Sequence, residues 1–303
     1  MHVEQELAQS DVSGAPLAAP DFEDNDEAIR AWDGPLFDRF VQFRHIICGG
    51  LAAHGEVALE LCPPRTGEKV LDIGCGFGET TIRIAELVGP EGEAVGVDAA
   101  PRFIEVAERE SADVPNARFA VVDVETTTFD ETFDMAYSRM GTMFFANPVA
   151  SLRRVREALV PGGRLAMAVW RSKTENEWMM RAQEITERFV TKPEEYDEPT
   201  CGPGPFSMAN ADTTSAILKS AGFDEISLRR CDRPIFMGSA DEAIELAMSI
   251  GPAGEILRLA GERAEHLHPQ VRAALGEGIA EWDTGDGLVA PASTWIVTAR
   301  VPS

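Results

Sequence analysis

The chain has 303 residues, of which 44% are apolar, enough for one large α/β domain with additions or for two small domains. Its 51 acidic residues outnumber 27 basic residues, and the formal net charge is -24 at pH 7. Such a chain is repelled by phosphate backbones and anionic lipid surfaces, so we expect neither nucleic acid nor a membrane as a partner. The lack of a secretory signal and the scattered cysteines indicate a cytoplasmic protein with reduced thiols.

The N-terminal part predicts a tail followed by helices. Residues 1–26 are rich in Asp, Glu, Ala and Pro and contain no Lys or Arg, so we expect a disordered acidic tail. The apolar spacing then predicts helices from about residue 25 to residue 61. We expect breaks in these helices near Gly34-Pro35 and Gly49-Gly50.

Residues 70–81, VLDIGCGFGETT, join an apolar strand to a helix through three glycines. Asp72 lies at the carboxyl end of the strand, where open α/β sheets bind ligands. Glycines at 74, 76 and 78 allow sharp turns and let a ligand lie against bare main chain. The spacing is G-x-G-x-G rather than the G-x-G-x-x-G of pyrophosphate-binding enzymes. A second strand ends in Asp98, whose carboxylate can accept both hydroxyls of a ribose.

Strands and helices alternate along the core. We expect strands at about 69–73, 94–98, 118–122, 133–137 and 164–170, and helices at about 78–88, 101–112 and 149–159. This alternation implies a parallel sheet covered on both faces, with right-handed crossovers. Beyond Trp170 we expect helices at 174–190 and 211–221, strands at 224–231 and 295–301, and a mostly helical stretch at 240–283.

The glycine run, Val121-Val122-Asp123, Phe133–Arg139 and Leu159–Leu165 together resemble the class I S-adenosylmethionine (SAM)-dependent methyltransferases. The resemblance covers about residues 66–170. It implies an α/β, Rossmann-like, doubly wound seven-stranded sheet whose last two strands are antiparallel. Motifs such as Trp32-Asp33-Gly34-Pro35 and Glu175-Asn176-Glu177-Trp178 resemble a bacterial small-molecule subgroup, related to ubiquinone/menaquinone-biosynthesis-type methyltransferases.

The resemblance also implies a domain arrangement. Residues 27–65 would form an N-terminal helical cap, and residues 66–170 the SAM-binding core. Residues 171–303 would supply the remaining strands. We expect insertions at about 171–210 and 235–290 to form a helical lid over the substrate.

The resemblance implies SAM as cofactor and S-adenosyl-L-homocysteine as product. Asp72 would hold the methionine ammonium group, Asp98 the ribose, and Asp123 with the Val124 N–H the adenine edge. Arg44 would meet the SAM carboxylate. Further cofactor contacts are expected from Gly74, Cys75, Gly76, Gly78, Ala99, Phe103, Ser138 and Arg139.

Methyl transfer is an in-line displacement, so the enzyme must align acceptor and sulfonium and exclude water. We expect transfer to a small apolar or aromatic metabolite through an oxygen, carbon or nitrogen acceptor. The general base is unknown; His45, His266 and His268 are the candidates. We expect no metal centre. The expected substrate pocket consists of Phe144, Phe145, Trp178, Phe206, Met208 and Met237.

Two other functions stay open. The protein could bind SAM without transferring its methyl group, or it could perform another chemistry on the same fold, such as nicotinamide-dependent dehydrogenation. The glycine spacing and the Pro161-Gly162-Gly163 turn argue against a dehydrogenase. The sequence leaves open the acceptor, a homodimer, and whether residues 235–290 form a lid or a dimer surface.

Overall fold

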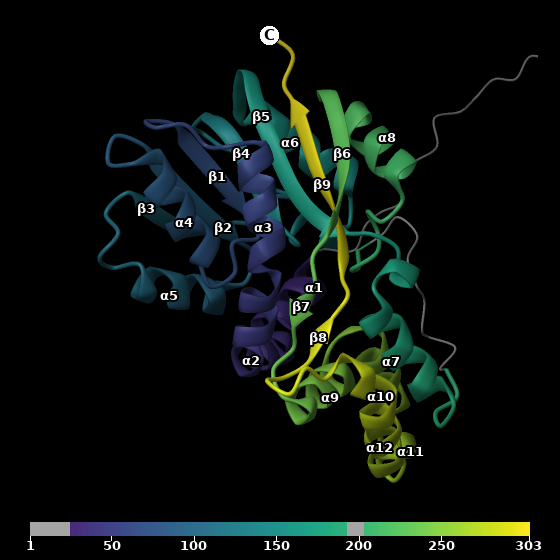
Figure 1. Cartoon of the computed structure of the whole chain (residues 1–303). Coiled ribbons are helices and arrows are strands. Elements are labelled where there is room, and N and C mark those ends of the chain that lie inside the picture. The colour runs from purple at the N-terminus through teal and green to yellow at the C-terminus, as the bar shows by residue number, and fades with distance from the viewer. Residues whose placement is uncertain (1–24, 193–202) are drawn as a thin grey trace, which may run out of the picture.

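The computed structural model describes residues 25–192 and 203–303, and its centre is a seven-stranded sheet. The strand order is β3-β2-β1-β4-β5-β9-β6, and β9 is antiparallel to both neighbours. This confirms the predicted doubly wound sheet with an antiparallel pair at one edge (Figure 1). The strands are β1 (Lys69–Ile73), β2 (Glu93–Asp98), β3 (Ala117–Val121), β4 (Phe133–Arg139), β5 (Leu159–Trp170), β6 (Asp224–Asp232) and β9 (Ser293–Arg300).

Successive residues of each strand point to opposite faces of the sheet, and helices cover both faces. Met135 and Tyr137 of β4 pack with helices α3 (Gly50–Leu61) and α4 (Glu79–Val88). Ala136, between them, belongs to a second cluster with α6 (Pro148–Glu157) and α8 (Ala211–Ala221). The sheet is therefore apolar on both sides, as a central parallel sheet requires. Helix α5 (Pro101–Glu110) packs against β2 and β3.

The N-terminal helices are interrupted at Gly34-Pro35, as predicted, but not at Gly49-Gly50, where both glycines keep helical dihedral angles; the second irregularity is at Phe43. Helices α1 (Asp26–Ala31) and α2 (Phe37–Gln42) are joined by a π-helical turn at Trp32–Leu36, where Pro35 removes a backbone donor. A second π-helical turn, His45–Gly49, leads into α3. Residues 1–24 of the predicted tail lie outside the described residues. The predicted tail boundary is slightly late, because Asp26 already begins α1.

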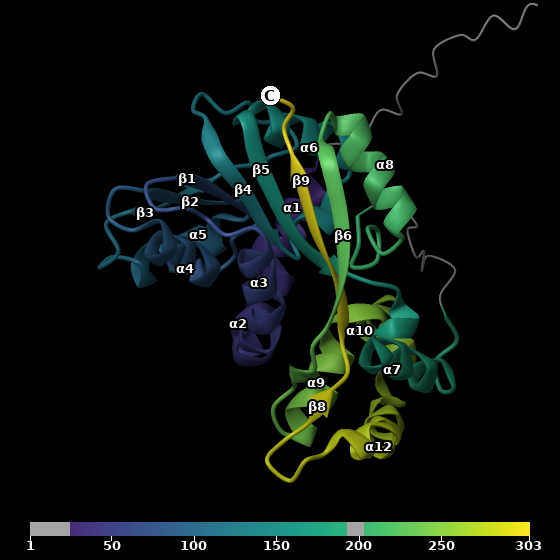
Figure 2. The same cartoon turned by 45° about the horizontal axis from the view of Figure 1, so that its top comes forward.

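A bundle of helices lies beyond one end of the sheet (Figure 2). It contains α7 (Glu177–Glu187), α9 (Ala240–Ser249), α10 (Gly251–Ala260) and α12 (His268–Ile279), with the short α11 (Glu262–Glu265). Two segments far apart in sequence therefore build one unit, since α7 packs against α10 and α12. Residues 193–202 of the predicted insertion at about 171–210 lie outside the described residues. No helix in the described ranges is both long and apolar enough to cross a membrane.

One feature was not predicted. Strands β7 (Ile235–Phe236) and β8 (Val289–Ala290) form an antiparallel pair, where the sequence analysis assigned an insertion. Two residues per strand are too few to give a period-two pattern in the sequence. The pair extends β6 and β9 toward the bundle (Figures 1 and 2), and β7 contacts the N-terminal helices.

Candidate functional site

The carboxyl ends of β1, β2, β3 and β4 open into a cavity of about 410 Å³, which we call the inner cavity. The sheet contributes the glycine run and carboxylates on one side. The N-terminal helices contribute Ile29, Trp32 and Phe40, and the bundle contributes Trp178 and Leu246. A cavity of this size, apolar with a few converging polar groups, is typical of a small-molecule site.

The glycine run adopts a backbone that other residues rarely adopt. Gly74, Gly76 and Gly78 have φ angles of 66°, 55° and 85°. A side chain at Gly74 would also contact Gly141, with 3.0 Å between the added Cβ and the Gly141 Cα. The loops after β1 and β4 thus contact each other at Gly74 and Gly141, where neither residue has a side chain. This close contact leaves main chain exposed to the cavity.

Two predicted cofactor residues lie behind this main chain rather than on the cavity surface. The Ser138 hydroxyl is buried and donates to the Ile73 carbonyl at 2.9 Å, which ties β4 to the start of the glycine run. Gly78 caps helix α4 and is closely packed against Phe119 and Ala107. Neither residue lines the inner cavity. Both therefore shape the loop that does.

Asp72 lines the cavity although its side chain is almost completely buried. Its carboxylate accepts a hydrogen bond of 2.7 Å from the Thr81 hydroxyl. Burial raises the pKa of Asp72 to about 6, against the opposing effects of Thr81 and Arg139. A carboxylate held in this way is stabilised by a cationic ligand, which would restore its ionised form.

Asp98 and Asp123 lie at the ends of the next two strands. One Asp98 oxygen accepts from the Gly76 N–H and the other from the Ala100 N–H, both at 3.0 Å. Burial raises the pKa of Asp98 in spite of these bonds. Asp123 accepts from the Glu125 N–H at 2.9 Å. Each carboxylate retains lone pairs for a ligand, and both line the cavity together with Ala99 and Val124.

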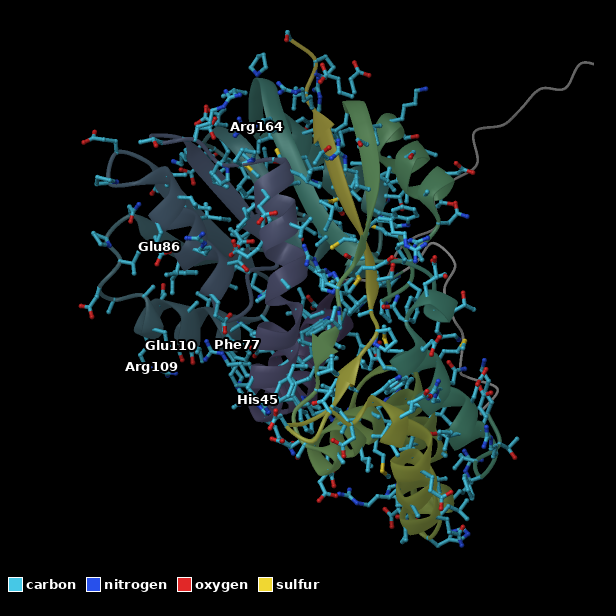
Figure 3. The ribbon with its side chains drawn as sticks, in the orientation of Figure 1. His45, Phe77, Glu86, Arg109, Glu110 and Arg164 are labelled. Atoms are coloured by element: carbon cyan, nitrogen blue, oxygen red, sulfur yellow. The ribbon has the colours of Figure 1, made fainter. Side chains whose placement is uncertain are left out.

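The structure separates the two arginines that the sequence assigns to the cofactor. Arg139 lines the inner cavity, and its guanidinium donates to the Cys48 carbonyl at 3.0 Å. Arg44 does not line it. The Arg44 side chain bonds to Glu79 and Glu110 and lies 4.4 Å from the Phe77 ring centre. Figure 3 labels Phe77 and Glu110.

Aromatic rings fill the space next to the carboxyl end of β2. Phe103 lines the cavity and packs against Phe77, with 4.8 Å between ring centres, and against Phe37 at 4.9 Å. Cys75 also lines the cavity. Burial and the nearby Asp98 and Asp72 raise the pKa of its thiol well above the usual value, so it is a neutral packing group there.

Three of the six residues predicted for the substrate pocket line the inner cavity, namely Phe144, Phe145 and Trp178. The other three lie elsewhere: Met208 and Met237 are buried in the core, and Phe206 packs against it. The pattern of apolar residues cannot separate a pocket wall from ordinary core, because both are apolar.

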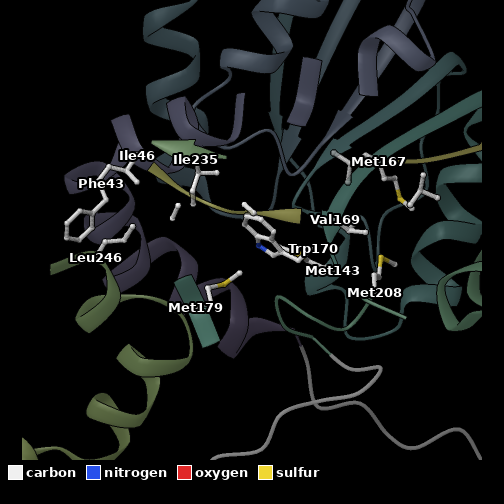
Figure 4. Close-up of a cluster of buried hydrophobic side chains, with 14 of the residues drawn as sticks. Phe43, Ile46, Met143, Met167, Val169, Trp170, Met179, Met208, Ile235 and Leu246 are labelled. Atoms are coloured by element: carbon white, nitrogen blue, oxygen red, sulfur yellow. The ribbon is translucent and has the colours of Figure 1, made fainter. Parts of the chain in front are cut away.

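The cavity also has apolar wall residues that the sequence analysis did not assign to it. They come from the N-terminal helices, the β4 loop, β5, β7 and the bundle, and Figure 4 shows several of them around Trp170. Of these residues, only Trp32 belongs to a sequence motif that could have indicated a place in the cavity wall. The main members are Trp32, Phe40, Ile46, Met143, Trp170, Met179, Ile235, Leu246 and Ile250.

None of the three candidate histidines lines the inner cavity. His45 is half-exposed, and its Nε2 lies 3.1 Å from Glu242. His266 is exposed, and His268 begins α12 in the bundle. A fourth histidine, His54, is buried in α3 against β9. The titratable side chains that line the cavity are Cys48, Asp72, Cys75, Glu79, Asp98, Asp123, Glu125 and Arg139.

The comparisons with known proteins agree with this geometry. Residues 64–224, slightly more than half of the chain, match the methyltransferase-domain family. Aklanonic acid methyltransferase DauC of Streptomyces sp. (strain C5) is 37% identical over 37% of this chain and 52% of its own. Demethylmenaquinone methyltransferase of Staphylococcus aureus (strain JH9) is 32% identical over 33% of this chain and 42% of its own.

The solved structure of the YcgJ protein from Bacillus subtilis superposes with a TM-score of 0.54. It is 16% identical, and the match covers 83% of this chain and 99% of that one. At this identity the likeness concerns the fold. The matched stretches span about half or less of the two curated relatives.

The seven-stranded sheet and the matched stretch are those of a class I, Rossmann-like methyltransferase domain. The chain belongs to the methyltransferase-domain family.

Proposed function

We propose that this protein transfers a methyl group from SAM to a small, largely apolar or aromatic metabolite. The observation that carries the proposal is the division of one cavity into two halves. Its sheet side includes the carboxylates of Asp72, Asp98 and Asp123, and its opposite side is aromatic and aliphatic. The carboxylates suit the cationic and hydroxyl groups of SAM, and the apolar half suits a flat acceptor.

SAM would lie across the ends of the strands. Its ammonium group would bind Asp72, its ribose hydroxyls Asp98, and its adenine edge Asp123 with the Val124 N–H. Arg139, rather than Arg44, would bind the carboxylate, because Arg44 is already paired with Glu79 and Glu110 while Arg139 bonds only to a backbone carbonyl among the described residues. Phe103 would pack against the adenine.

The acceptor would lie between Phe144, Phe145, Trp170 and Trp178. Methyl transfer is a displacement at carbon, so the contributions of these residues are alignment and exclusion of water. The helices at 27–65 would act as a cap, and the bundle would act as a lid over the acceptor. The two curated relatives act, by their names, on aklanonic acid and on demethylmenaquinone, which supports a polycyclic or quinone-like acceptor.

Transfer is tested with SAM that has an isotopically labelled methyl group. The protein is incubated with it and a metabolite extract of the source organism, and products are identified by mass spectrometry. We expect the label on a small apolar product. Turnover to S-adenosyl-L-homocysteine separates a transferase from a protein that only binds SAM. Label on nucleic acid would contradict the proposal, because the acceptor would then not be a small metabolite. The net charge of -24 argues against that outcome.

A further inference from the structure

A second cavity of about 640 Å³ lies beside the inner one, and we call it the outer cavity. Its walls are Val41 and Ala52 of the N-terminal helices and Arg83 of α4, with Tyr137 from β4. His45 lies at its edge and marks its position in Figure 3. The methyl-transfer site described above makes no use of this cavity.

The two cavities share four lining residues: Cys48, Glu79, Thr80 and Arg139. The two cavities therefore meet at the last residue of β4, the π-helical turn and the start of α4. At the centre of this partition the Arg139 guanidinium is held to the Cys48 carbonyl by one hydrogen bond of 3.0 Å. Side-chain rotamers exchange faster than helices move, so this partition can open without a change of fold.

The roof of the inner cavity is attached much more firmly. Arg102 on α5 bonds to Asp33 and Asp38 of the N-terminal segment. Trp32 packs edge-on against Phe144 with 5.0 Å between ring centres. Opening the roof would separate these groups and expose buried rings, whereas moving Arg139 breaks one hydrogen bond.

The charges at the outer cavity suit the passage of a cationic molecule. Arg44 is paired with Glu79 and Glu110, and Arg83 with Glu56 and Glu86. SAM carries a net positive charge, and the carboxylates behind the partition attract it. The outer cavity thus leads to the end of the site where the proposed function places the methionine group.

We propose that SAM enters and S-adenosyl-L-homocysteine leaves through the outer cavity, and that Arg139 closes this passage. This inference rests on the proposed function. In this arrangement Arg139 moves off the Cys48 carbonyl, admits the cofactor, and then binds its carboxylate. The cofactor can then exchange while the bundle stays closed over the acceptor half.

The test is to block the outer cavity and measure cofactor exchange. Ala52 is exposed and lines the outer cavity, whereas its neighbour Ala53 is exposed and lines neither cavity, so Ala52→Trp and Ala53→Trp form a matched pair. Association and dissociation of tritium-labelled SAM are followed by rapid mixing and by chase with unlabelled SAM. We expect both rate constants to fall about tenfold in Ala52→Trp, with the equilibrium affinity unchanged, and no effect in Ala53→Trp.

Val41→Trp provides a second block from the other wall, should Ala52→Trp fail to fold. Unchanged rates in a folded blocked variant would overturn the passage. A weaker affinity without slower exchange would also overturn it, because the outer cavity would then be part of the binding site. Failure of the unaltered protein to bind SAM would instead refute the proposed function.

Discussion

The carboxylates at the ends of adjacent strands are the residues on which the site depends. Asp72 and Asp98 are both removed from water, and burial raises the pKa of each. Without a cation the pair is unfavourable, and a ligand with an ammonium or sulfonium group relieves this. Asp98 also accepts a hydrogen bond from the Gly76 N–H and so helps to hold the main chain of the glycine run in place.

Replacing Asp98 by Ala tests the proposed ribose contact. In the proposed arrangement the change removes a charge-assisted bidentate contact worth on the order of 2 to 3 kcal/mol, and we expect SAM affinity to fall about a hundredfold. Isothermal titration gives the affinity. Asp98→Asn keeps the size of the side chain and serves as the comparison, with an intermediate loss. Binding like that of the parent would show that the ribose lies elsewhere.

Asp72 predicts a pH dependence of SAM binding. Its pKa of about 6 in the free protein means that the carboxylate is ionised above pH 6 and protonated below it. A bound ammonium favours the ionised form, so affinity is high above pH 6 and falls as the pH decreases below 6. Titrations between pH 5 and pH 8 measure this. In Asp72→Asn we expect weak SAM binding whose affinity does not change between pH 5 and pH 8. If the affinity of this variant still falls below pH 6, another group is responsible for the pH dependence.

At the scale of elements, the core and the bundle meet at Asn176, at the start of α7. This side chain is completely buried and fully bonded. Its amide nitrogen donates to the carbonyls of Arg171, Ser172 and Ser293, and its oxygen accepts from the Ser293 N–H. One residue therefore connects the end of β5 and the start of α7 to β9.

Asn176→Ala would leave the Ser293 main chain buried without these partners. We expect a loss of about 2 to 3 kcal/mol in the free energy of unfolding. Chemical denaturation measures it, with Glu177→Ala at the neighbouring exposed position as control. A loss no larger than that of the control would mean that water replaces the amide.

His54 joins α3 to β9 and predicts a stability that depends on pH. Its Nε2 donates to the Arg233 carbonyl and its Nδ1 accepts from the Thr294 hydroxyl, which fixes the neutral ring. Burial lowers its pKa below the usual 6.5. The unfolded chain then binds the proton more readily, so stability is full above pH 6.5 and is lost as the pH falls below it.

The measurement is the melting temperature from pH 8 to pH 5. We expect it to fall less in His54→Gln than in the unaltered protein. An equal fall in both would assign the effect to the carboxylates.

At the scale of the whole molecule, the sequence predicts the core better than the walls of the site. The glycine run after β1 and Asp98 can be predicted from nearby residues alone. Sharp turns favour glycine, and ligands of open α/β sheets bind at the carboxyl ends of the strands. Phe206 and Met208 show the limit: their apolarity predicts a place in the pocket, but the packing of distant segments places them elsewhere. The sequence does not predict Trp170 and Ile235 as wall residues for the same reason, since they reach the cavity only when β5, β7 and the N-terminal helices meet.

The most direct test of the account is a titration of the purified protein with SAM and, separately, with NAD. We expect SAM to bind at one site per chain with a dissociation constant in the range of about 1 µM to 1 mM, typical of enzyme ligands. NAD should give no heat. Binding of NAD without binding of SAM would contradict the central claim, because the carboxylate-lined cavity would then serve a different cofactor.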